Sequence, residues 1–213
     1  GDWSDGCSSD LPARAIALAV AHPVCTGGVR YRRQTAAASG QVDTVPYGCF
    51  RRSLWQEMGG FDETLLCNED YEFFWRVRSA GGRIFFDPSI RSVYFPRASH
   101  RALMLQYFRY GWWKTQMLRK NPASVRARQL LPIALSAVLG LALVSSPFVP
   151  FARLLTGAGG LLYGCVIAYA SFQLAVRARD LGLLAVLLVT FVTVHIAWCA
   201  GVWTNLIGRN VSR

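Results

Sequence analysis

Hydrophobic and polar positions divide the chain into an N-terminal half of short alternating segments and a C-terminal half of long apolar runs. Each run is free of Asp, Glu, Lys and Arg and reaches the roughly 20 residues that cross a bilayer. Pro132, Pro147 and Pro150 make the first run the least regular. The pattern predicts about three transmembrane helices in residues 129–213. The three runs are Leu130–Ala152, Leu154–Val176 and Leu181–Gly208.

The N-terminal half, residues 1–100, alternates helix and strand patterns, which is typical of an α/β domain with a mixed sheet. Asp10 precedes an apolar helical stretch, and Asn68 precedes a helix that Gly81-Gly82 ends. Glu72 and Arg76 in that helix have the i, i+4 spacing of an ion pair. The expected helices are 10–22, 53–58 and 68–80, and the expected strands are 42–45, 83–86 and 90–95.

Between the two halves, residues 101–128 form a basic and aromatic region. Helical periodicity over Arg101–Lys120, with many aromatic and basic side chains, predicts an amphipathic helix at a membrane surface. An ordinary amphipathic packing helix would show the same pattern. Four residues of this helix have the spacing i, i+3, i+4 and i+7 and so share one face: Gln106, Arg109, Tyr110 and Trp113.

The charge of the chain is unevenly distributed. Residues 1–87 carry 9 Lys/Arg and 11 Asp/Glu, whereas residues 88–213 carry 14 Lys/Arg and a single acid, Asp180. This excess of Lys and Arg in residues 88–213 indicates an anionic partner. Because the basic block leads directly into apolar segments, we favour membrane lipids and phosphorylated lipid over nucleic acid.

Arginines beside the apolar runs indicate the orientation in the membrane. Arg126 and Arg128 precede the first run, and Arg177 and Arg179 follow the second. The positive-inside rule places both clusters in the cytosol, so we expect a multi-pass protein of the cell (inner) membrane with its catalytic part cytosolic. Three full spans would leave the C-terminal arginines outside, and a re-entrant segment would remove that conflict. For His195, inside the third run, we expect a neutral ring bonded within the bundle.

The N-terminus and the cysteines exclude several classes. The six cysteines form no Cys-x-x-Cys pair and no short Cys/His spacing, so zinc is not expected. We also expect no disulfide, consistent with a reducing cytosolic compartment. The first nine residues are polar, with no signal-peptide pattern and no initiator Met, so we expect a fragment of something longer.

The chemically suggestive segment is Asn68-Glu69-Asp70. A carboxylate in the first turn of a helix is stabilised by free N–H groups and by the helix dipole. Such a carboxylate suits a general base, but the same position suits a capping acid without a function. The functional interpretation is favoured by two further segments, which are residues 60–63 and the polar face of the helix after residue 100.

Taken together, these residues resemble the family-2 glycosyltransferases, which have a GT-A fold. Within that family they are most similar to the membrane-bound branch that includes the succinoglycan-biosynthesis glucosyltransferase. The resemblance covers about Ala15 to Pro132, over half of the chain. The matching segments are Gly27-Gly28 with Tyr31-Arg32, Val42–Val45, Gly48 with Phe50–Arg52, Gly60–Glu63, Asn68–Asp70, Tyr94 with Pro96-Arg97, and Gln106–Gly111 with Lys114.

The resemblance implies the C-terminal, acceptor-side part of a GT-A domain with a Rossmann-like sheet. It implies that Asp70 is the general base that deprotonates an acceptor hydroxyl, which then attacks a nucleotide-diphosphate sugar with inversion. Glu69 and Gly48 belong to the implied substrate-binding set, with Gly48 allowing the backbone to approach a substrate.

The helix after residue 100 contributes the rest of that set. Gln106-x-x-Arg109-Tyr110 resembles the Gln-x-x-Arg-Trp motif of processive synthases, with Tyr in place of Trp, which leaves processivity open. Arg109 would neutralise the departing diphosphate, Tyr110 would stack on the acceptor sugar, and Trp113 completes the set.

One departure from the family concerns the metal. The complete enzyme is expected to use a divalent cation, Mg²⁺ or Mn²⁺, held by an Asp-x-Asp motif. That motif is absent from this chain, since Asp2 and Asp5 have the wrong spacing. Many GT-A enzymes use a His after the last strand as a ligand, but the neighbours of His100 match a branch in which we expect another residue. No metal ligand is therefore assigned.

The sequence thus predicts an inverting glycosyltransferase, incomplete as given, in exopolysaccharide or cell-envelope glycan synthesis. The expected partners are a nucleotide-diphosphate sugar, a polyprenyl-diphosphate-linked or glycan acceptor, and membrane lipids, with no nucleic acid. Two alternatives stay open: a non-catalytic membrane-anchored remnant or partner subunit without the donor-binding half, and a small membrane transport or scaffold protein.

Overall fold

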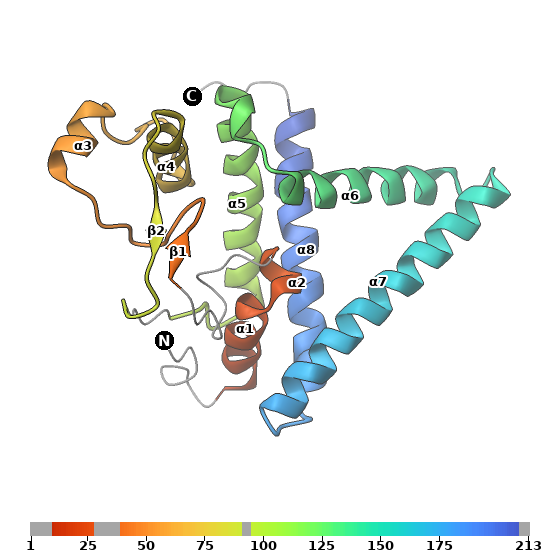
Figure 1. The fold of residues 1–213 in the computed structure, drawn as a ribbon. Coiled ribbons are helices and arrows are strands. Elements are labelled where there is room, and N and C mark those ends of the chain that lie inside the picture. The colour runs from red at the N-terminus through yellow and green to blue at the C-terminus, as the bar shows by residue number, and fades with distance from the viewer. Residues whose placement is uncertain (1–9, 28–38, 91–94, 209–213) are drawn as a thin grey trace.

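The computed structural model describes residues 10–27, 39–90 and 95–208, apart from a few side chains, and within them the chain is mainly helical (Figure 1). Two long helices lie side by side at the centre, and the other elements pack around them. In chain order the helices are α1 (Leu11–Ala21), α2 (Pro23–Thr26), α3 (Arg52–Glu57), α4 (Glu69–Ser79), α5 (His100–Lys120), the 3₁₀ helix η2 (Pro122–Ser124), α6 (Ala127–Ser145), α7 (Pro150–Arg177) and α8 (Leu183–Ile207).

The central pair is α5 and α8, which run parallel and in contact along most of their length (Figure 1). His100 at the start of α5 is hydrogen-bonded to Thr190 of α8, with 2.9 Å between Nε2 and Oγ1. At the other end, Arg119 Nη2 donates to the Asn205 carbonyl at 2.8 Å. The helix predicted over Arg101–Lys120 is confirmed, and it packs lengthwise on an apolar helix. Its position at a membrane surface stays a prediction.

Two hydrophobic clusters join α1 to the long helices. In one, Ala15 and Ala19 of α1 meet α7 and α8 around the buried Phe191. In the other, Ile16 and Val20 meet Leu103 of α5 and Val194 of α8. The helix predicted after Asp10 is confirmed, and Pro23, predicted to end it, also begins the short helix α2. Asp180, the single acid of the C-terminal region, pairs with Arg14 of α1 at 2.9 Å.

The predicted Rossmann-like mixed sheet is wrong for the residues that the structure describes. The described strands are β1 (Gly40–Gln41) and β2 (Phe85–Phe86), which pair antiparallel, Gly40 with Phe86 and Gln41 with Phe85. The pairing continues only through a hydrogen bond from Val42 N–H to the Ile84 carbonyl. Val42 and Ile84, beside the strands, pack on Phe73, Phe74 and Val77 of α4. Among the described residues this short ribbon lacks the further strands that a layered sheet needs. The strand predicted over 90–95 lies largely outside the described residues.

The arm formed by α6 and α7 extends away from the central pair (Figure 1). The prediction of three spans is wrong: two described helices, α7 and α8, are long and apolar enough to cross a membrane. The first predicted run is broken, because α6 ends at Ser145 and Pro150 begins α7. The apolar part of α6, Gln129–Ser145, would reach only ~25 Å at 1.5 Å per residue, short of a ~30 Å hydrocarbon core.

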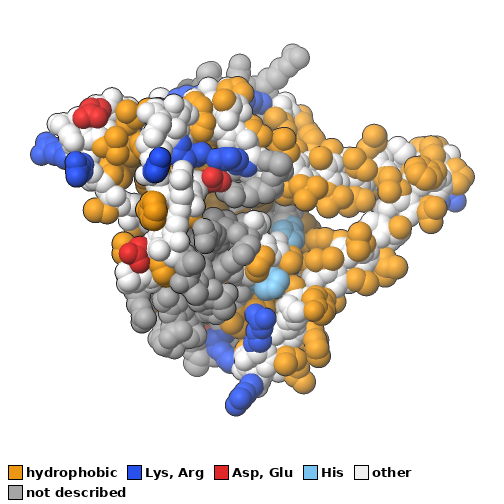
Figure 2. Space-filling view, viewed as in Figure 1, with side chains coloured by type: hydrophobic (Ala, Val, Ile, Leu, Met, Phe, Trp, Pro, Cys, Tyr) orange, Lys and Arg blue, Asp and Glu red, His pale blue; other side chains and the backbone are white. Residues whose placement is uncertain are grey.

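Large hydrophobic side chains are exposed along this arm, as Figure 2 shows. A row of this length is unusual on the surface of a soluble domain and is typical of contact with lipid or a partner. The exposed hydrophobic residues include Leu131, Leu135, Leu141, Leu143, Val144, Phe148, Phe151, Leu154, Leu161, Leu162 and Tyr169.

Candidate functional site

The segment Asn68-Glu69-Asp70 begins α4, as predicted. Asn68 occupies the N-cap position, but it adopts a left-handed backbone with φ of 67° and makes no side-chain cap. Asn is among the few residues that accept this conformation. The Asn68 side-chain Nδ2 is buried and has no hydrogen-bond partner. The segment therefore leaves a polar donor unused two residues before Asp70.

The Asp70 carboxylate lies in the first turn of α4, where Oδ1 accepts a hydrogen bond from the Tyr71 N–H at 2.7 Å. Although one side of Asp70 is open to solvent, desolvation by the protein on its other sides raises the pKa of the carboxyl group. The Tyr71 N–H opposes that rise, the charge of Glu69 adds to it, and the charge of Lys114 opposes it. A raised pKa makes Asp70 a better proton acceptor than an ordinary aspartate once it is ionised.

Lys114 of α5 supplies positive charge to the site. The side chain is 7% exposed, and its ammonium lies 3.5 Å from the centroid of the Tyr71 ring. Nζ also lies 3.3 Å from the sulfur of Met117. Because a buried ammonium costs free energy unless it is compensated, the ring and the Asp70 charge stabilise it together.

Arg109 approaches the same segment at Cys67. Burial raises the pKa of the Cys67 thiol, Glu69 adds to the rise, and the positive charge of Arg109 opposes it. Arg109 is exposed on α5, so its guanidinium is open to an anionic ligand from solvent. The structure thus brings Arg109 and Lys114 to the N-terminal end of α4.

Trp113 holds α4 and α5 together at this point. It packs against a cluster of the buried residues Leu65, Tyr71 and Met117. The Tyr71 hydroxyl donates to the Ser124 carbonyl at 3.4 Å, which joins the cluster to η2. In this structure the described contacts of Trp113 are packing contacts, and its predicted substrate contact stays a prediction.

Gln106 and Tyr110 form a pair one to two turns before Lys114. Gln106 Nε2 donates to the Tyr110 hydroxyl at 2.8 Å, as the shared helix face predicts. The Tyr110 ring lies 5.6 Å from the Tyr107 ring, centroid to centroid, and leans on the cluster between α1 and α8. The structure therefore orients the ring of Tyr110 from two sides.

Gly48 lies against α4 rather than beside open space. A Cβ atom at Gly48 would lie 2.3 Å from Cζ of Phe74, so any larger residue would clash with that ring. Packing alone explains the glycine, and its predicted role in substrate approach stays a prediction.

Two ion pairs fix the surroundings of Asp70. Arg76 binds Glu72 through Nε, 2.8 Å from Oε1, which confirms the predicted i, i+4 pair. Arg76 also donates to the carbonyls of Met58 and Gly60 and so ties the turn after α3 to α4. Glu72 is 3% exposed, so this pair stabilises α4 from inside the domain.

The second ion pair joins Lys120, at the end of α5, to Asp62 at 2.6 Å. Burial opposes ionisation of Asp62, but hydrogen bonds from Lys120 and Thr64 outweigh it and lower the pKa of Asp62. The Gly60–Glu63 segment is therefore a structural connection between α3 and α5 in this fold.

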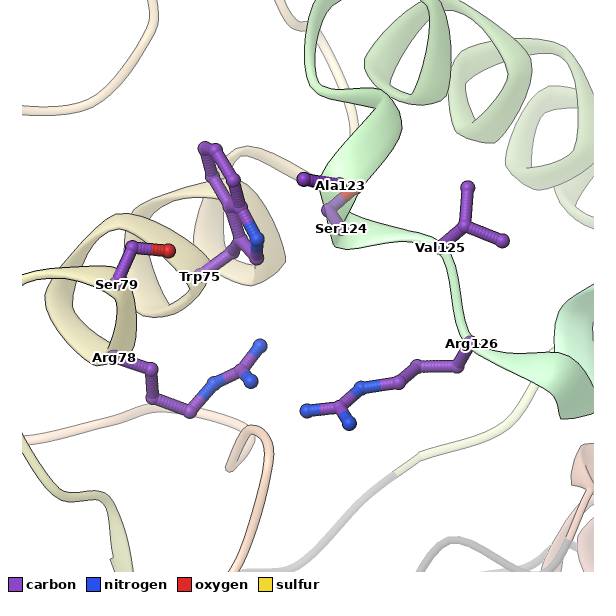
Figure 3. A pocket seen from close by; sticks show the side chains of 7 residues that line it. All are labelled: Trp75, Arg78, Ser79, Ala123, Ser124, Val125 and Arg126. Carbon is purple, nitrogen blue, oxygen red and sulfur yellow. The ribbon is translucent and has the colours of Figure 1, made fainter.

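A pocket opens between the C-terminal part of α4 and the segment that leads into α6. Its volume is about 200 Å³. Figure 3 shows the guanidinium groups of Arg78 and Arg126 pointing toward each other across it. No prediction from the sequence included this pocket. The lining residues are Trp75, Arg78, Ser79, Ala123, Ser124, Val125 and Arg126.

The described residues include no group of three or more His, Cys, Asp or Glu side chains that could hold a metal ion. The divalent cation expected for the complete enzyme stays a prediction, and no chemical step below is routed through it. His100 bonds to Thr190, and His195 is bonded within the helix bundle, as predicted: its Nδ1 lies 2.9 Å from the Tyr163 hydroxyl, and its Nε2 lies 2.9 Å from the Val24 carbonyl.

The sequence missed three residues of this region. Lys114 was named only among the matching segments and was given no role. A lysine among aromatic residues on a helix can be a buried charge stabilised by its neighbours, and that signal was available. Asn68 was assigned only a capping role. Arg78 lies in the same helix as Arg76, which is paired with Glu72. No sequence pattern distinguishes Arg78 from an ordinary surface arginine.

One curated relative supports the resemblance. The chain is 29% identical over 198 residues to the succinoglycan biosynthesis protein ExoA of Rhizobium meliloti (strain 1021). The match covers 91% of this chain and 56% of that protein, so the chain spans about half the length of the relative. No family model and no solved structure matches the chain. The chain is distantly homologous to a protein of succinoglycan biosynthesis.

Proposed function

We propose that this chain forms the acceptor-side part of an inverting glycosyltransferase that acts in exopolysaccharide or cell-envelope glycan synthesis. The observation that carries the proposal is the position of Asp70. Its carboxylate stands at the open N-terminal end of α4, with a raised pKa and with the positive charge of Lys114 of α5 acting on it. The distant homology to a succinoglycan biosynthesis protein supports this interpretation.

In the proposed reaction, the Asp70 carboxylate accepts the proton of an acceptor hydroxyl. The hydroxyl oxygen then forms a bond to the anomeric carbon of the donor sugar, and the bond to the nucleoside diphosphate breaks with inversion. Arg109 stabilises the negative charge on the departing diphosphate, because an exposed guanidinium can bind two phosphate oxygens at once. The positive charge of Lys114 lowers the pKa of Asp70 and so favours the ionised carboxylate.

Substrate positioning is assigned to the remaining predicted residues. Gln106 holds the hydroxyl of Tyr110, so that the ring is preoriented to stack on an acceptor sugar. Glu69 precedes Asp70 in α4, and Trp113 packs on Tyr71, the residue after it; both are assigned to substrate positioning. The nucleotide-diphosphate sugar and a divalent cation, Mg²⁺ or Mn²⁺, would be bound by a donor-binding half that carries the Asp-x-Asp motif.

The acceptor is proposed to be lipid-linked, for example through a polyprenyl diphosphate, with α7 and α8 as the membrane anchor. Both helices have the length and composition of membrane spans. The orientation does not follow from the positive-inside rule, because basic residues lie at both ends of the bundle. Arg177 stands at one end of α8, and Arg119 with Lys120 lies beside the other.

The test measures sugar transfer by membranes that carry the chain, alone and with any preceding coding sequence in its reading frame restored. Labelled nucleotide sugars and a lipid extract serve as substrates. Asp70→Asn keeps the size of the side chain but removes its basicity, so it should reduce transfer by about 10²–10⁴-fold. Glu57→Gln, at an exposed residue of α3, is the matched control and should leave transfer unchanged.

Transfer that survives Asp70→Asn would contradict the assignment of the base. An absence of transfer both from the chain alone and from the extended chain would favour the non-catalytic alternative. The orientation is tested separately with Glu63→Cys and Leu181→Cys, each made in a chain whose six native cysteines are replaced by Ser, and a membrane-impermeant thiol reagent. Protection of a Glu63 cysteine in sealed, right-side-out cells supports a cytosolic site.

A further inference from the structure

The pocket between α4 and η2 is lined by two arginines and contains no acidic lining residue (Figure 3). Trp75, Arg78 and Ser79 come from α4, and the opposite wall is the segment Ala123–Arg126. At about 200 Å³ the pocket is smaller than the usual site of a drug-sized molecule, so it suits a small polar group.

Arg78 is the unusual member of this pocket. Its Nε and Nη2 atoms are buried and have no hydrogen-bond partner in the described structure. A guanidinium is always charged and only donates hydrogen bonds, so it needs an acceptor when water is excluded. Buried donors without partners are rare in folded proteins, and each one calls for an explanation. An anion that enters the pocket and draws the guanidinium toward it would supply acceptors for both nitrogens.

Arg126 faces Arg78 from the other wall. Arg126 Nη2 donates to Asp43 Oδ1 at 2.9 Å, in a pair that is partly open to solvent. That single carboxylate compensates one guanidinium, while the pocket presents two of them to each other. Two cations that face across a small space repel, and a multiply charged anion between them turns the repulsion into attraction.

The remaining walls fit a tetrahedral oxyanion rather than a flat organic acid. The Trp75 indole stands beside the guanidinium of Arg78, with its nitrogen on the side toward the opposite wall (Figure 3). The indole N–H is a further donor, and Ser79 adds a hydroxyl. Donors that converge from α4 and from the start of α6 match the several acceptor oxygens of a phosphate group.

We propose that this pocket binds a phosphate group, with Arg78 as the principal donor and Arg126 as the second. The site is separate from Asp70, because Arg78 is eight residues farther along α4, or ~12 Å at 1.5 Å per residue. The group could come from inorganic phosphate or from a lipid headgroup with a terminal phosphate. Both share the chemistry that the arginines recognise, and the experiment distinguishes them.

The experiment measures binding of ³²P-labelled inorganic phosphate to the full chain in detergent by equilibrium dialysis, with chloride holding the ionic strength constant. We expect saturable binding. Arg78→Gln keeps donors but removes the charge, and it should weaken binding about tenfold or more. Arg101→Gln changes an exposed arginine of α5 by the same charge and should leave the affinity unchanged.

Arg126→Gln provides a second variant, because the partly exposed pair with Asp43 contributes little to folding. Far-UV circular dichroism confirms that each variant is folded. Phosphate binding that does not saturate, or that both variants leave at the wild-type affinity, overturns the proposal.

The source of the phosphate is settled with the chain in lipid nanodiscs. If phosphatidic acid in the nanodisc competes with labelled phosphate and phosphatidylcholine does not, the site accepts a headgroup. If neither lipid competes while labelled phosphate still binds through Arg78, the site accepts the free anion. Either result supports the phosphate pocket, and neither depends on glycosyltransferase activity.

Discussion

Gly111 of α5 and Gly201 of α8 each face the backbone of the other helix in a reciprocal contact. A Cβ atom on Gly111 would lie 2.1 Å from the Trp198 carbonyl oxygen, and one on Gly201 would lie 2.1 Å from the Phe108 carbonyl oxygen. The two helices therefore approach to backbone distance, as small residues allow between helices in membranes. This contact sets the position of α5, and with it the positions of Arg109 and Lys114 relative to α4.

Gly201→Ala should destabilise the chain because the new methyl group meets backbone that cannot move without separating the helices. We expect a loss of about 1–3 kcal/mol in the free energy of unfolding, the usual cost of overpacking. The measurement is chemical unfolding in detergent followed by circular dichroism.

Gly140→Ala in α6 is the matched control, because a Cβ atom there meets nothing within 4 Å. Relative to glycine, alanine in a helix interior should stabilise by about 0.5–1 kcal/mol. Equal effects of the two substitutions would contradict the close contact between α5 and α8.

Arg76→Met should be strongly destabilising. It leaves the buried Glu72 carboxylate without its guanidinium partner and frees the carbonyls of Met58 and Gly60. Breaking a buried pair from one side typically costs about 3–5 kcal/mol. Arg52→Met, at an exposed arginine of α3, should change stability by less than about 0.5 kcal/mol.

The double variant Glu72→Leu with Arg76→Met separates charge from packing. It removes both charges, so it should recover part of the lost stability. If the single and double variants unfold at the same denaturant concentration, the unpaired carboxylate is not the cause of the loss.

The sequence was informative wherever a pattern is local. The capping residue, the glycine stops and the i, i+4 pair predicted α1, α3, α4 and α5 closely, and the last two apolar runs became α7 and α8. The Gln106–Tyr110 contact also follows from spacing on one helix. Each of these features depends on neighbours within a few residues along the chain.

Features that depend on distant partners were missed or wrong. The alternation at Val42–Val45 indicated a strand, but a strand requires pairing that the described residues supply only at β1 and β2. The first apolar run had enough length for a span, and the prolines at 147 and 150 broke it. The parallel contact of α5 with α8 and the pocket at Arg78 join segments that are far apart in sequence.

Asp70→Asn should leave the chain at least as stable as before at neutral pH. The pKa of Asp70 is raised in the folded state, which means that the ionised carboxylate is less stable in the folded chain than in the unfolded chain. Ionised Asp70 therefore lowers the free energy of unfolding at neutral pH. This loss disappears as the pH falls through the pKa that Asp70 has in the unfolded chain. Asparagine removes it while it abolishes the proposed base, as expected of a residue kept for activity.

The check is the melting temperature of both proteins at neutral pH and near pH 3. At neutral pH we expect the variant to melt at the same or a higher temperature than the wild type, and the difference to shrink in acid. A variant that melts clearly lower at neutral pH would assign Asp70 a structural role as a capping acid.

The pH dependence of sugar transfer tests the surroundings of Asp70. The base must be ionised, so transfer should fall in acid with a midpoint above that of an ordinary aspartate. This fall at low pH is the acid limb of the pH profile. Glu69→Gln removes a charge that raises the pKa of Asp70, so the acid limb should move to lower pH. Lys114→Met removes a charge that lowers this pKa, so the limb should move to higher pH.

The comparison uses the position of the acid limb of kcat/KM and not its height, because both residues lie close enough to the site to change the rate as well. Glu57→Gln, at an exposed residue of α3, should leave the limb in place. Opposite shifts for Glu69→Gln and Lys114→Met would be difficult to produce by general loss of packing. Shifts in the same direction, or none, would mean that the group titrating in the reaction is not Asp70.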